Sequence, residues 1–222
     1  MKNIVIIPAR GGSKRLPKKN IRQLGGIPLI VHSIEYAKKN AALIQDIYVT
    51  TDNAEIKELS RSLNVNVIER PQALSGDRAS TVSALKHILE SVKVQYDNVI
   101  LLQPTNPLRP KNLLNEALQK FTTSNFDSLM TVSPNEKKLG KIKNNKFVPY
   151  SYSIGQRSQD LEPLYYENGL LYISKSNIIL ENIILGENNV PFITKHPYAS
   201  VDIDTIEDLD YAEFILNKYP NE

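Results

Sequence analysis

Short apolar runs rich in β-branched residues alternate with segments of helical periodicity through residues 4–132. Such apolar runs predict strands buried on both faces, and helices between them predict parallel pairing. The alternation therefore predicts an α/β fold with a mainly parallel sheet flanked by helices. The expected strands cover residues 4–7, 46–51, 65–69, 98–103 and 128–132, and the expected helices cover residues 28–39, 54–63, 81–92 and 113–121.

Residues 134–168 interrupt this pattern, because they are polar, rich in Lys, Asn and Tyr, and without helical period. Asn144–Asn145 predicts a hairpin turn between two short extended runs. A structureless insert of this length is unusual inside a compact domain, so we expect it to project as an arm or lid. Strands at 169–174 and 200–203 and a helix from Thr205 to about 217 complete a single predicted domain over residues 1–222.

The absence of cysteine excludes a disulfide scaffold, a thiolate zinc site and a cysteine nucleophile. It is compatible with a reducing compartment, and we expect a cytoplasmic protein. No apolar run approaches the roughly 18 residues of a membrane span. The N-terminal apolar run ends at Pro8 and is too short for a signal-peptide core. We therefore expect no membrane association.

Charge is distributed unevenly along the chain, although the formal net charge is only +3. The first 34 residues carry seven Lys or Arg and no acid, whereas the last 22 carry seven acids and one Lys. Asymmetry of this kind points to a polyanionic partner or to solvated helix faces, and composition does not choose between them.

A basic glycine loop, residues 9–20, follows the first expected strand. Ligands of open α/β sheets bind outside the carboxyl ends of the strands, where this loop lies. Gly11 and Gly12 allow close backbone approach, and their N–H groups could form an anion nest. Arg10, Lys14 and Lys19 add charges that suit phosphate oxygens. The loop matches neither GxxxxGK[ST] nor GxGxxG, and its alternative interpretation is a flexible surface loop.

Asp202 and Asp204 flank Ile203 near the acidic end of the chain. On an extended segment this spacing points both carboxylates to one face and Ile203 to the core. Paired carboxylates suit Mg²⁺, which shares its oxygen ligands with substrate phosphates. Alternatively, Asp204 caps the following helix, whose later acids then lie on a solvated face.

Five ordered motifs across residues 4–212 resemble those of the acylneuraminate cytidylyltransferases, the CMP-sialic acid synthetases. They are PARGGSK with LP and KN (8–20), ERP followed by residues 77–81, LLQPTNPLR (101–109), NG with YI (168–173) and VDIDT (201–205). The third motif has Asn106 where the family pattern has Ser. The resemblance implies a Rossmann-like nucleotide-diphosphosugar transferase fold with a protruding dimerisation arm.

By the same resemblance, the protein activates a nonulosonic acid with CTP, giving a CMP-sugar and pyrophosphate with Mg²⁺ on Asp202 and Asp204. The implied catalytic residues are Arg10, Lys14, Lys19 and Asp204. The implied nucleotide-binding residues are Ala9, Arg10, Gly11, Gly12, Asn20, Arg70, Ser80 and Thr81. Ser80 alternatively serves only as a helix cap.

For the sugar, the resemblance implies Gln103, Thr105, Lys141 and Arg157. Gln103 is a polar amide at a strand end, where a ligand-facing role is favoured over core packing. Arg109, in the same turn, could bind ligand or anchor the loop to an acid. Lys141 and Arg157 are candidates for the sugar carboxylate, and the family's arm, here about 134–168, completes the site of the partner subunit in a homodimer. The tyrosines of this insert are candidate interface anchors or sugar platforms.

Two alternatives stay open. A CMP-Kdo synthetase shares a related opening motif, although the KN, LLQPTNPLR and DIDT segments fit the sialic acid type better. A non-catalytic protein could bind a sugar nucleotide or nucleic acid, but for nucleic acid we would expect basic and aromatic residues interleaved over an extended face. The residues do not identify the nonulosonic acid, because neuraminate, legionaminate and pseudaminate differ by small groups.

Overall fold

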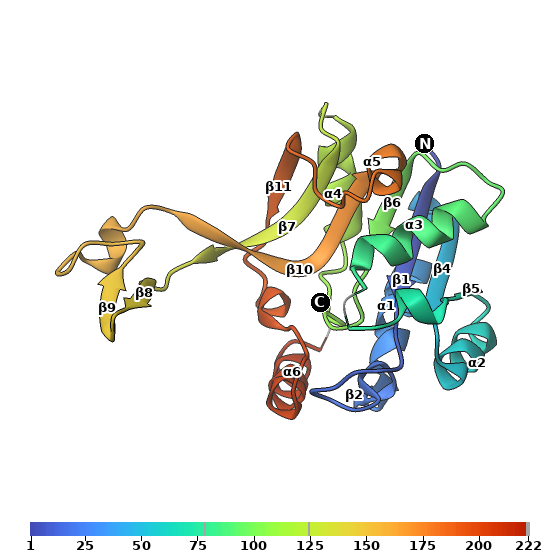
Figure 1. Ribbon diagram of the computed structural model, residues 1–222, viewed down its shortest axis with the longest axis horizontal. Helices are drawn as coiled ribbons and strands as arrows, with labels where there is room; N and C mark the ends of the chain where they lie inside the picture. The colour runs from blue at the N-terminus through green and yellow to red at the C-terminus, as the bar shows by residue number, and fades with distance from the viewer. Residues whose placement is uncertain (78, 124, 221–222) are drawn as a thin grey trace.

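The computed structural model describes residues 1–77, 79–123 and 125–220 and contains a seven-stranded sheet flanked by helices (Figure 1). The strand order is β11-β7-β10-β6-β1-β4-β5. Only β10 runs antiparallel to its neighbours, so the predicted mainly parallel, mixed sheet is confirmed. The strands are β1 (Asn3–Pro8), β4 (Asp46–Thr51), β5 (Asn66–Glu69), β6 (Asn98–Leu101), β7 (Ser128–Asn135), β10 (Leu164–Lys175) and β11 (Asn189–Ile193).

Six α-helices occur in the described ranges, and the four expected between the first strands and the one expected after Thr205 are among them. They are α1 (Leu29–Lys39), α2 (Ala54–Ser62), α3 (Thr81–Ser91), α4 (Leu113–Thr122), α5 (Ser176–Leu180) and α6 (Ile206–Lys218). Short 3-10 turns lie at Lys19–Ile21, Ala41–Leu43, Gln72–Leu74, Ser158–Asp160 and Pro197–Ser200, and a small hairpin joins β2 (Gln23–Leu24) to β3 (Ile27–Pro28). No helix of these described ranges is long and apolar enough to cross a membrane.

The sheet is buried on both faces, which explains the continuous apolar runs of its central strands. In β1, Val5 and Ile7 belong to the core shared with α1, α2 and α4, whereas Ile4 and Ile6 belong to the core shared with α3 and α5. Successive side chains of a strand point to opposite faces, so both sets must be apolar when helices cover both sides.

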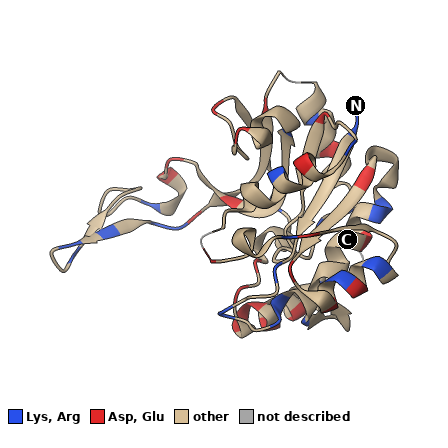
Figure 2. Ribbon diagram, turned by 45° about the vertical axis from the view of Figure 1, so that its right-hand side comes forward, with Lys and Arg blue, Asp and Glu red and all other residues tan. Residues whose placement is uncertain are grey.

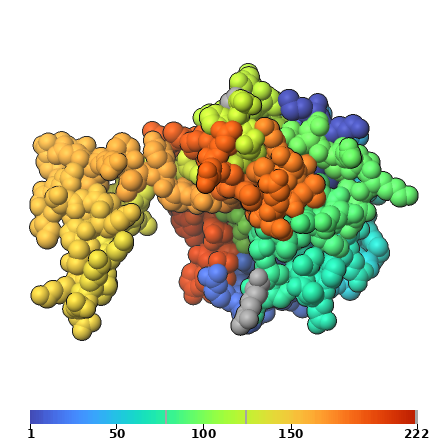
Figure 3. Space-filling model, turned by 45° about the horizontal axis from the view of Figure 1, so that its top comes forward, coloured from blue at the N-terminus to red at the C-terminus, as the bar shows by residue number. Residues whose placement is uncertain are grey.

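The insert at 134–168 forms an arm that stands away from the rest of the molecule (Figures 1 and 3). β7 and β10 extend past the core, and a hairpin of β8 (Gly140–Lys143) and β9 (Lys146–Pro149) lies at the end of the arm. Asn144 and Asn145 form the turn with φ of 49° and 60°, so the predicted hairpin is confirmed. The role of the arm in dimerisation stays a prediction.

The strands expected for the main sheet differ from the structure at 200–203 and at β11. The expected strand at 200–203 is wrong, because Ser200 ends a 3-10 turn and residues 201–203 have no ladder partner. Strand β11 was not expected, since Pro191 interrupts a short run of five residues and proline argues against a strand inside a sheet. It nevertheless pairs in parallel with β7, at the edge of the sheet where a proline is tolerated.

A third apolar cluster joins the basic loop to the C-terminal helix. It contains Leu16 of the loop, Ile203 of the acidic segment and Leu209 of α6, together with Leu24, Leu29, Leu108, Tyr198, Val201, Ala212 and Ile215. Burial of these side chains brings the basic loop next to the acidic segment before α6.

Candidate active site

A cleft of about 460 Å³ opens at the carboxyl ends of β1 and β6. It lies between the basic loop, the start of α3, the turn after β6 and the segment before α6. This is the edge of an open α/β sheet where ligands bind. Among the predicted site residues, those lining the cleft are Arg10, Lys14, Lys19, Asn20, Arg70, Ser80, Thr81, Gln103, Thr105 and Asp204.

The basic loop is held by bonds from its own backbone. The Ala9 N–H donates to the Thr50 carbonyl at 3.0 Å, and the Gly11 N–H donates to Asp52 Oδ1 at 2.8 Å. A Cβ at Gly11 would lie 2.9 Å from Asn53 Cβ, so glycine is required by space there. The Gly11 N–H, expected to join an anion nest, is therefore already bonded within the protein.

The Asn20 side chain is bonded to the backbone of the basic loop, although the residue also lines the cleft. The residue is 6% exposed, and its Nδ2 donates to the Arg10 carbonyl at 2.9 Å. The bond ties the 3-10 turn at Lys19–Ile21 to the residue that follows Ala9. Asn20 thus fixes the backbone from which the Arg10 side chain extends.

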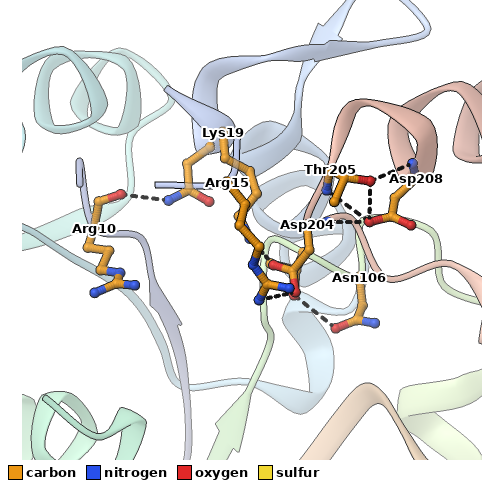
Figure 4. Close-up of polar contacts among 9 residues, drawn as sticks. Arg10, Arg15, Lys19, Asn106, Asp204, Thr205 and Asp208 are labelled. Atoms are coloured by element: carbon orange, nitrogen blue, oxygen red, sulfur yellow. Dashed lines mark hydrogen bonds and ion pairs between the residues drawn. The ribbon is translucent and has the colours of Figure 1, made fainter. Parts of the chain in front are cut away.

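Two acids neutralise part of the positive charge in the cleft. Asp77 pairs with Arg10 at 3.3 Å and with Lys14, and the Lys14 ammonium, with Arg10 adding to it, holds the pKa of Asp77 below its usual range. Asp204 pairs with Lys19 and Arg15, each at 2.7 Å (Figure 4). Five cationic side chains line the cleft against these two carboxylates, counted over the described residues, so its charge suits a polyanion.

Asp204 does not cap α6, which decides between the two interpretations of this residue. Thr205 is the N-cap, and its hydroxyl accepts the Asp208 N–H at 3.3 Å. Asp208 accepts in return from the Thr205 N–H at 2.8 Å and forms a capping box, so it is not simply a solvated acid of the helix face. The Asp204 carboxylate is left to face the cations of the basic loop.

The segment between Val201 and Asp204 alternates as predicted, with Ile203 fully buried. The Ile203 N–H donates to the Thr105 carbonyl at 2.8 Å. Desolvation raises the pKa of Asp202 above its usual range, the Thr105 hydroxyl opposes this shift, and the nearby Asp204 charge adds to it. Asp202 lines a neighbouring hollow beside the arm rather than the cleft itself.

Arg70 and Ser80 have structural partners at the cleft wall. Arg70 is 7% exposed and donates to the Thr50 carbonyl at 2.7 Å, and burial lowers its pKa. The Ser80 hydroxyl accepts the Ser83 N–H at 3.3 Å and caps α3. Ser80 still lines the cleft with Thr81, so the N-terminus of α3 points its partial positive charge there.

Arg109 is an anchor of the turn after β6 and lies outside the cleft. It donates to the Leu170 carbonyl at 2.7 Å, the Gln103 carbonyl at 2.8 Å and the Ser33 hydroxyl at 3.0 Å. Burial lowers the pKa of Arg109 to about 10. Anchoring of the turn was one expected alternative, but the acceptors are carbonyls and a hydroxyl rather than the expected acid.

Lys141 and Arg157 lie on the arm, away from the cleft of their own chain. Arg157 forms a two-bond pair with Asp160 at 2.7 and 3.1 Å, and the Lys141 ammonium lies 4.4 Å from the centre of the Tyr150 ring. Basic segments mark this arm in Figure 2. The structure therefore does not bring these two residues to the other predicted sugar-binding residues within one chain.

Besides Asp77, which pairs with Arg10 and Lys14, Arg15 and Asn106 were missed from the sequence. Arg15 lines the cleft, and its place in the basic loop was the available signal. Asn106 is buried behind the cleft, and its only signal was the departure from serine in the LLQPTNPLR motif.

Comparisons with known proteins agree over nearly the whole chain. Residues 4–219 match the family model described as cytidylyltransferase. The pseudaminic acid cytidylyltransferase of Campylobacter jejuni subsp. jejuni serotype O:23/36 is 34% identical, covering 97% of this chain and 96% of that protein. The N-acylneuraminate cytidylyltransferase of Streptococcus agalactiae serotype III is also 34% identical, covering 94% of this chain but 52% of that longer protein.

A solved structure supports the fold independently of close sequence similarity. A CMP:2-keto-3-deoxy-manno-octonic acid synthetase complexed with CTP superposes with a TM-score of 0.74. The match covers 98% of this chain and 99% of that one at 18% sequence identity.

Proposed function

The chain belongs to the cytidylyltransferase family, and from this premise we propose that it activates a nonulosonic acid with CTP, releasing pyrophosphate. The observation that carries the proposal is the cation-rich cleft at the strand ends, with Asp204 opposite the basic loop. The names of the two relatives above, pseudaminic acid and N-acylneuraminate cytidylyltransferase, support this class of acceptor.

The basic loop binds the triphosphate in this proposal. Arg10, Lys14 and Lys19 stabilise the charge that develops on the leaving pyrophosphate. These cations are paired with Asp77 and Asp204 in the structure, so nucleotide binding exchanges carboxylate partners for phosphate oxygens. Ala9, Gly11 and Gly12 supply the backbone of this loop, and Asn20, Arg70, Ser80 and Thr81 hold the nucleoside.

The reaction is a substitution at the α-phosphorus of CTP. The hydroxyl oxygen on the anomeric carbon of the sugar acid forms a bond to this phosphorus, and the bond to the pyrophosphate oxygen breaks. The hydroxyl proton is released in the overall reaction. Positioning and charge neutralisation supply the rate enhancement, as is general for phosphoryl-type transfer.

Asp202 and Asp204 fit a Mg²⁺ ion. Desolvation, with the nearby Asp204 charge adding to it, raises the pKa of Asp202, and a cation held by these carboxylates would relieve both effects. Within the described ranges no third His, Cys, Asp or Glu joins them, which suits an ion that takes its other ligands from phosphates and water. When bound, Mg²⁺ would supply neutralisation of phosphate oxygens and a lowered pKa of the acceptor hydroxyl.

For the acceptor, Gln103 and Thr105 come from the same chain as the nucleotide site. Lys141 and Arg157 bind the sugar carboxylate from the arm of a second copy in a homodimer, since Arg recognises carboxylates through two bonds. Exposed apolar side chains on the arm support an interface between copies, with Ile142 71% and Ile154 85% exposed. We place the reaction in the cytoplasm, which suits a chain without cysteine.

A mixing experiment tests whether the arm serves the partner. Arg157→Ala and Asp204→Asn are each expected to be nearly inactive. A dimer containing one copy of each keeps one complete site, so co-expression with random pairing should restore about a quarter of wild-type activity. Pyrophosphate release by the purified mixture measures this. Lys143→Ala, also on the arm, is the control and should keep full activity; a mixture no more active than its components would contradict sharing between copies.

The catalytic proposal is tested by incubating the protein with CTP, Mg²⁺ and a panel of acceptors. Pyrophosphate release is expected with at least one of neuraminate, legionaminate or pseudaminate, and less with Kdo. Preference for Kdo would support the alternative of a CMP-Kdo synthetase. Tight CTP binding with no release across the whole panel would instead support a non-catalytic nucleotide-binding protein.

A further inference from the structure

Asn106 is a buried amide at the meeting point of three chain segments behind the cleft. Its side chain is 1% exposed. It lies in the turn after β6, against the β10 backbone at Asn168 and Gly169 and against the segment that carries Asp202 and Asp204. Figure 4 shows Asn106 near Asp204.

The bonding capacity of this amide is well matched to its surroundings. Its Nδ2 donates to the Asn168 carbonyl and to the Val201 carbonyl, each at 3.0 Å. Its Oδ1 accepts from the Thr105 hydroxyl at 3.2 Å. A primary amide has two N–H donors and a carbonyl acceptor, so one side chain satisfies two backbone carbonyls and orients a neighbouring hydroxyl. Serine, with a single donor, could bond to only one of the two carbonyls.

The acidic segment depends on such contacts because it belongs to no strand. No ladder holds the described residues 201–204. The Asn106 bond to the Val201 carbonyl lies next to the bond from the Ile203 N–H to the Thr105 carbonyl, and these two bonds flank Asp202. The backbone on both sides of Asp202 is thereby bonded to the turn that carries Asn106.

The other bond of the amide reaches the strand that returns from the arm. The β10 register against β7 shifts between Glu167 and Tyr172, where the strand leaves the core. Gly169 has φ of +75° in this irregularity, and a Cβ there would lie 2.6 Å from Asn106 Oδ1. Gly169 therefore leaves the space that the Asn106 side chain occupies, and the two residues connect the turn after β6 to β10.

We propose that Asn106 is a positioning residue, which holds the carboxylates of Asp202 and Asp204 in place relative to the predicted acceptor residues Gln103 and Thr105. Its bond to the Val201 carbonyl fixes the acidic segment, and its bond to the Asn168 carbonyl ties that segment to the base of the arm. The inference rests on the proposed function, because these carboxylates matter only if they serve the nucleotidyl transfer. In the described part of the chain, the side-chain hydrogen bonds of Asn106 go to Thr105, Asn168 and Val201 and to none of the predicted nucleotide-binding residues, so we expect its effect on the metal and acceptor residues.

The test compares Asn106→Ala and Asn106→Ser with wild-type enzyme, using Asn98→Ala as the matched control. Asn98 is also a buried amide, 3% exposed, at the opposite end of β6, where its Nδ2 donates to Asn3 Oδ1 at 2.9 Å. Folding is monitored by circular dichroism, and kcat, KM for CTP and the half-saturating Mg²⁺ concentration are measured. Mn²⁺ affinity in the presence of CTP is measured separately by electron paramagnetic resonance.

For Asn106→Ala we expect kcat to fall about 10- to 100-fold and Mg²⁺ and Mn²⁺ affinity to weaken, with KM for CTP changed less than about twofold. Asn106→Ser should give a smaller loss, and it provides the comparison if the alanine variant does not fold. Asn98→Ala should lose stability without a change in kcat or metal affinity. Equal kinetic changes in the Asn98 and Asn106 variants, or unchanged Mn²⁺ affinity in folded Asn106 variants, would overturn the proposal. A wild-type protein that releases no pyrophosphate refutes the proposed function instead, and Mn²⁺ affinity still tests the positioning role.

Discussion

Replacing Asp204 by asparagine is expected to lower kcat at least about 100-fold at saturating CTP, Mg²⁺ and acceptor. Asparagine has nearly the same shape, so the change removes the negative charge and little packing. That charge is the only one within reach of both Lys19 and Arg15 among the described contacts, at 2.7 Å from each. The initial rate of pyrophosphate release measures the effect, and the half-saturating Mg²⁺ concentration should rise in parallel.

Asp210→Asn is the charge-matched control for this variant. Asp210 lies exposed on α6, the helix that begins just after Asp204. We expect its kcat to stay within about twofold of wild type. Loss of the Asp204 charge leaves the mostly buried Lys19 ammonium without its partner, and a stability cost of about 1–3 kcal/mol follows. A folded Asp204→Asn enzyme with a near-native rate would exclude the assigned role of this carboxylate.

Replacing Arg10 by alanine is expected to lower kcat/KM at least about 100-fold. Its guanidinium lies at the cleft, 3.2 Å from the Gly76 carbonyl and 3.3 Å from Asp77, and it is free to exchange these acceptors for phosphate oxygens. Arg10→Lys keeps a charge but loses the two-bond geometry, so we expect an intermediate loss. Steady-state rates with varied CTP, and pyrophosphate inhibition, distinguish binding from turnover.

Lys18→Ala serves as the control for general loss of positive charge in the same loop. Lys18 is 73% exposed at its side chain and pairs with Glu55 outside the cleft. It should retain near-native kcat/KM. If Lys18→Ala and Arg10→Ala lose activity equally, the loop contributes only a diffuse electrostatic field, and the specific role of Arg10 is rejected.

Much of the fold was predictable because burial on both sheet faces leaves a direct trace in the sequence. Ile4 and Ile6 cover one face while Val5 and Ile7 cover the other, so the strand must be apolar throughout. The edge strand β11 leaves no such trace. It pairs with β7 along one edge only, so a proline such as Pro191, which lacks an N–H donor, is tolerated there. The segment at 200–203 showed strand-like alternation, but side-chain and turn contacts hold it instead of a ladder.

The functional residues likewise divide into those that the sequence predicted and those that only the structure revealed. Arg10, Lys19 and Asp204 stood out because opposite charges gather at the two ends of the chain, and the resemblance to the cytidylyltransferases is confirmed by the family match. Residue spacing could not predict that Asp77 pairs with Lys14, or that Asn106 connects the turn after β6 to β10 and to the acidic segment. Their roles arise from contacts 63 and 95 positions apart in the chain, between Lys14 and Asp77 and between Asn106 and Val201.

Local periodicity and charge, taken from the amino-acid sequence alone, determined the α/β class, the position of the arm and the presence of a basic and an acidic segment near opposite ends of the chain. Only the tertiary structure decided which acid meets which cation, that Thr205 rather than Asp204 caps α6, and that Arg109 anchors a turn through carbonyls. Periodicity indicates whether a side chain is buried, and this can be inferred for each residue without knowing which residues it contacts. Partner choice depends on how distant segments pack, and that is set only when the core formed by Leu16, Ile203 and Leu209 closes.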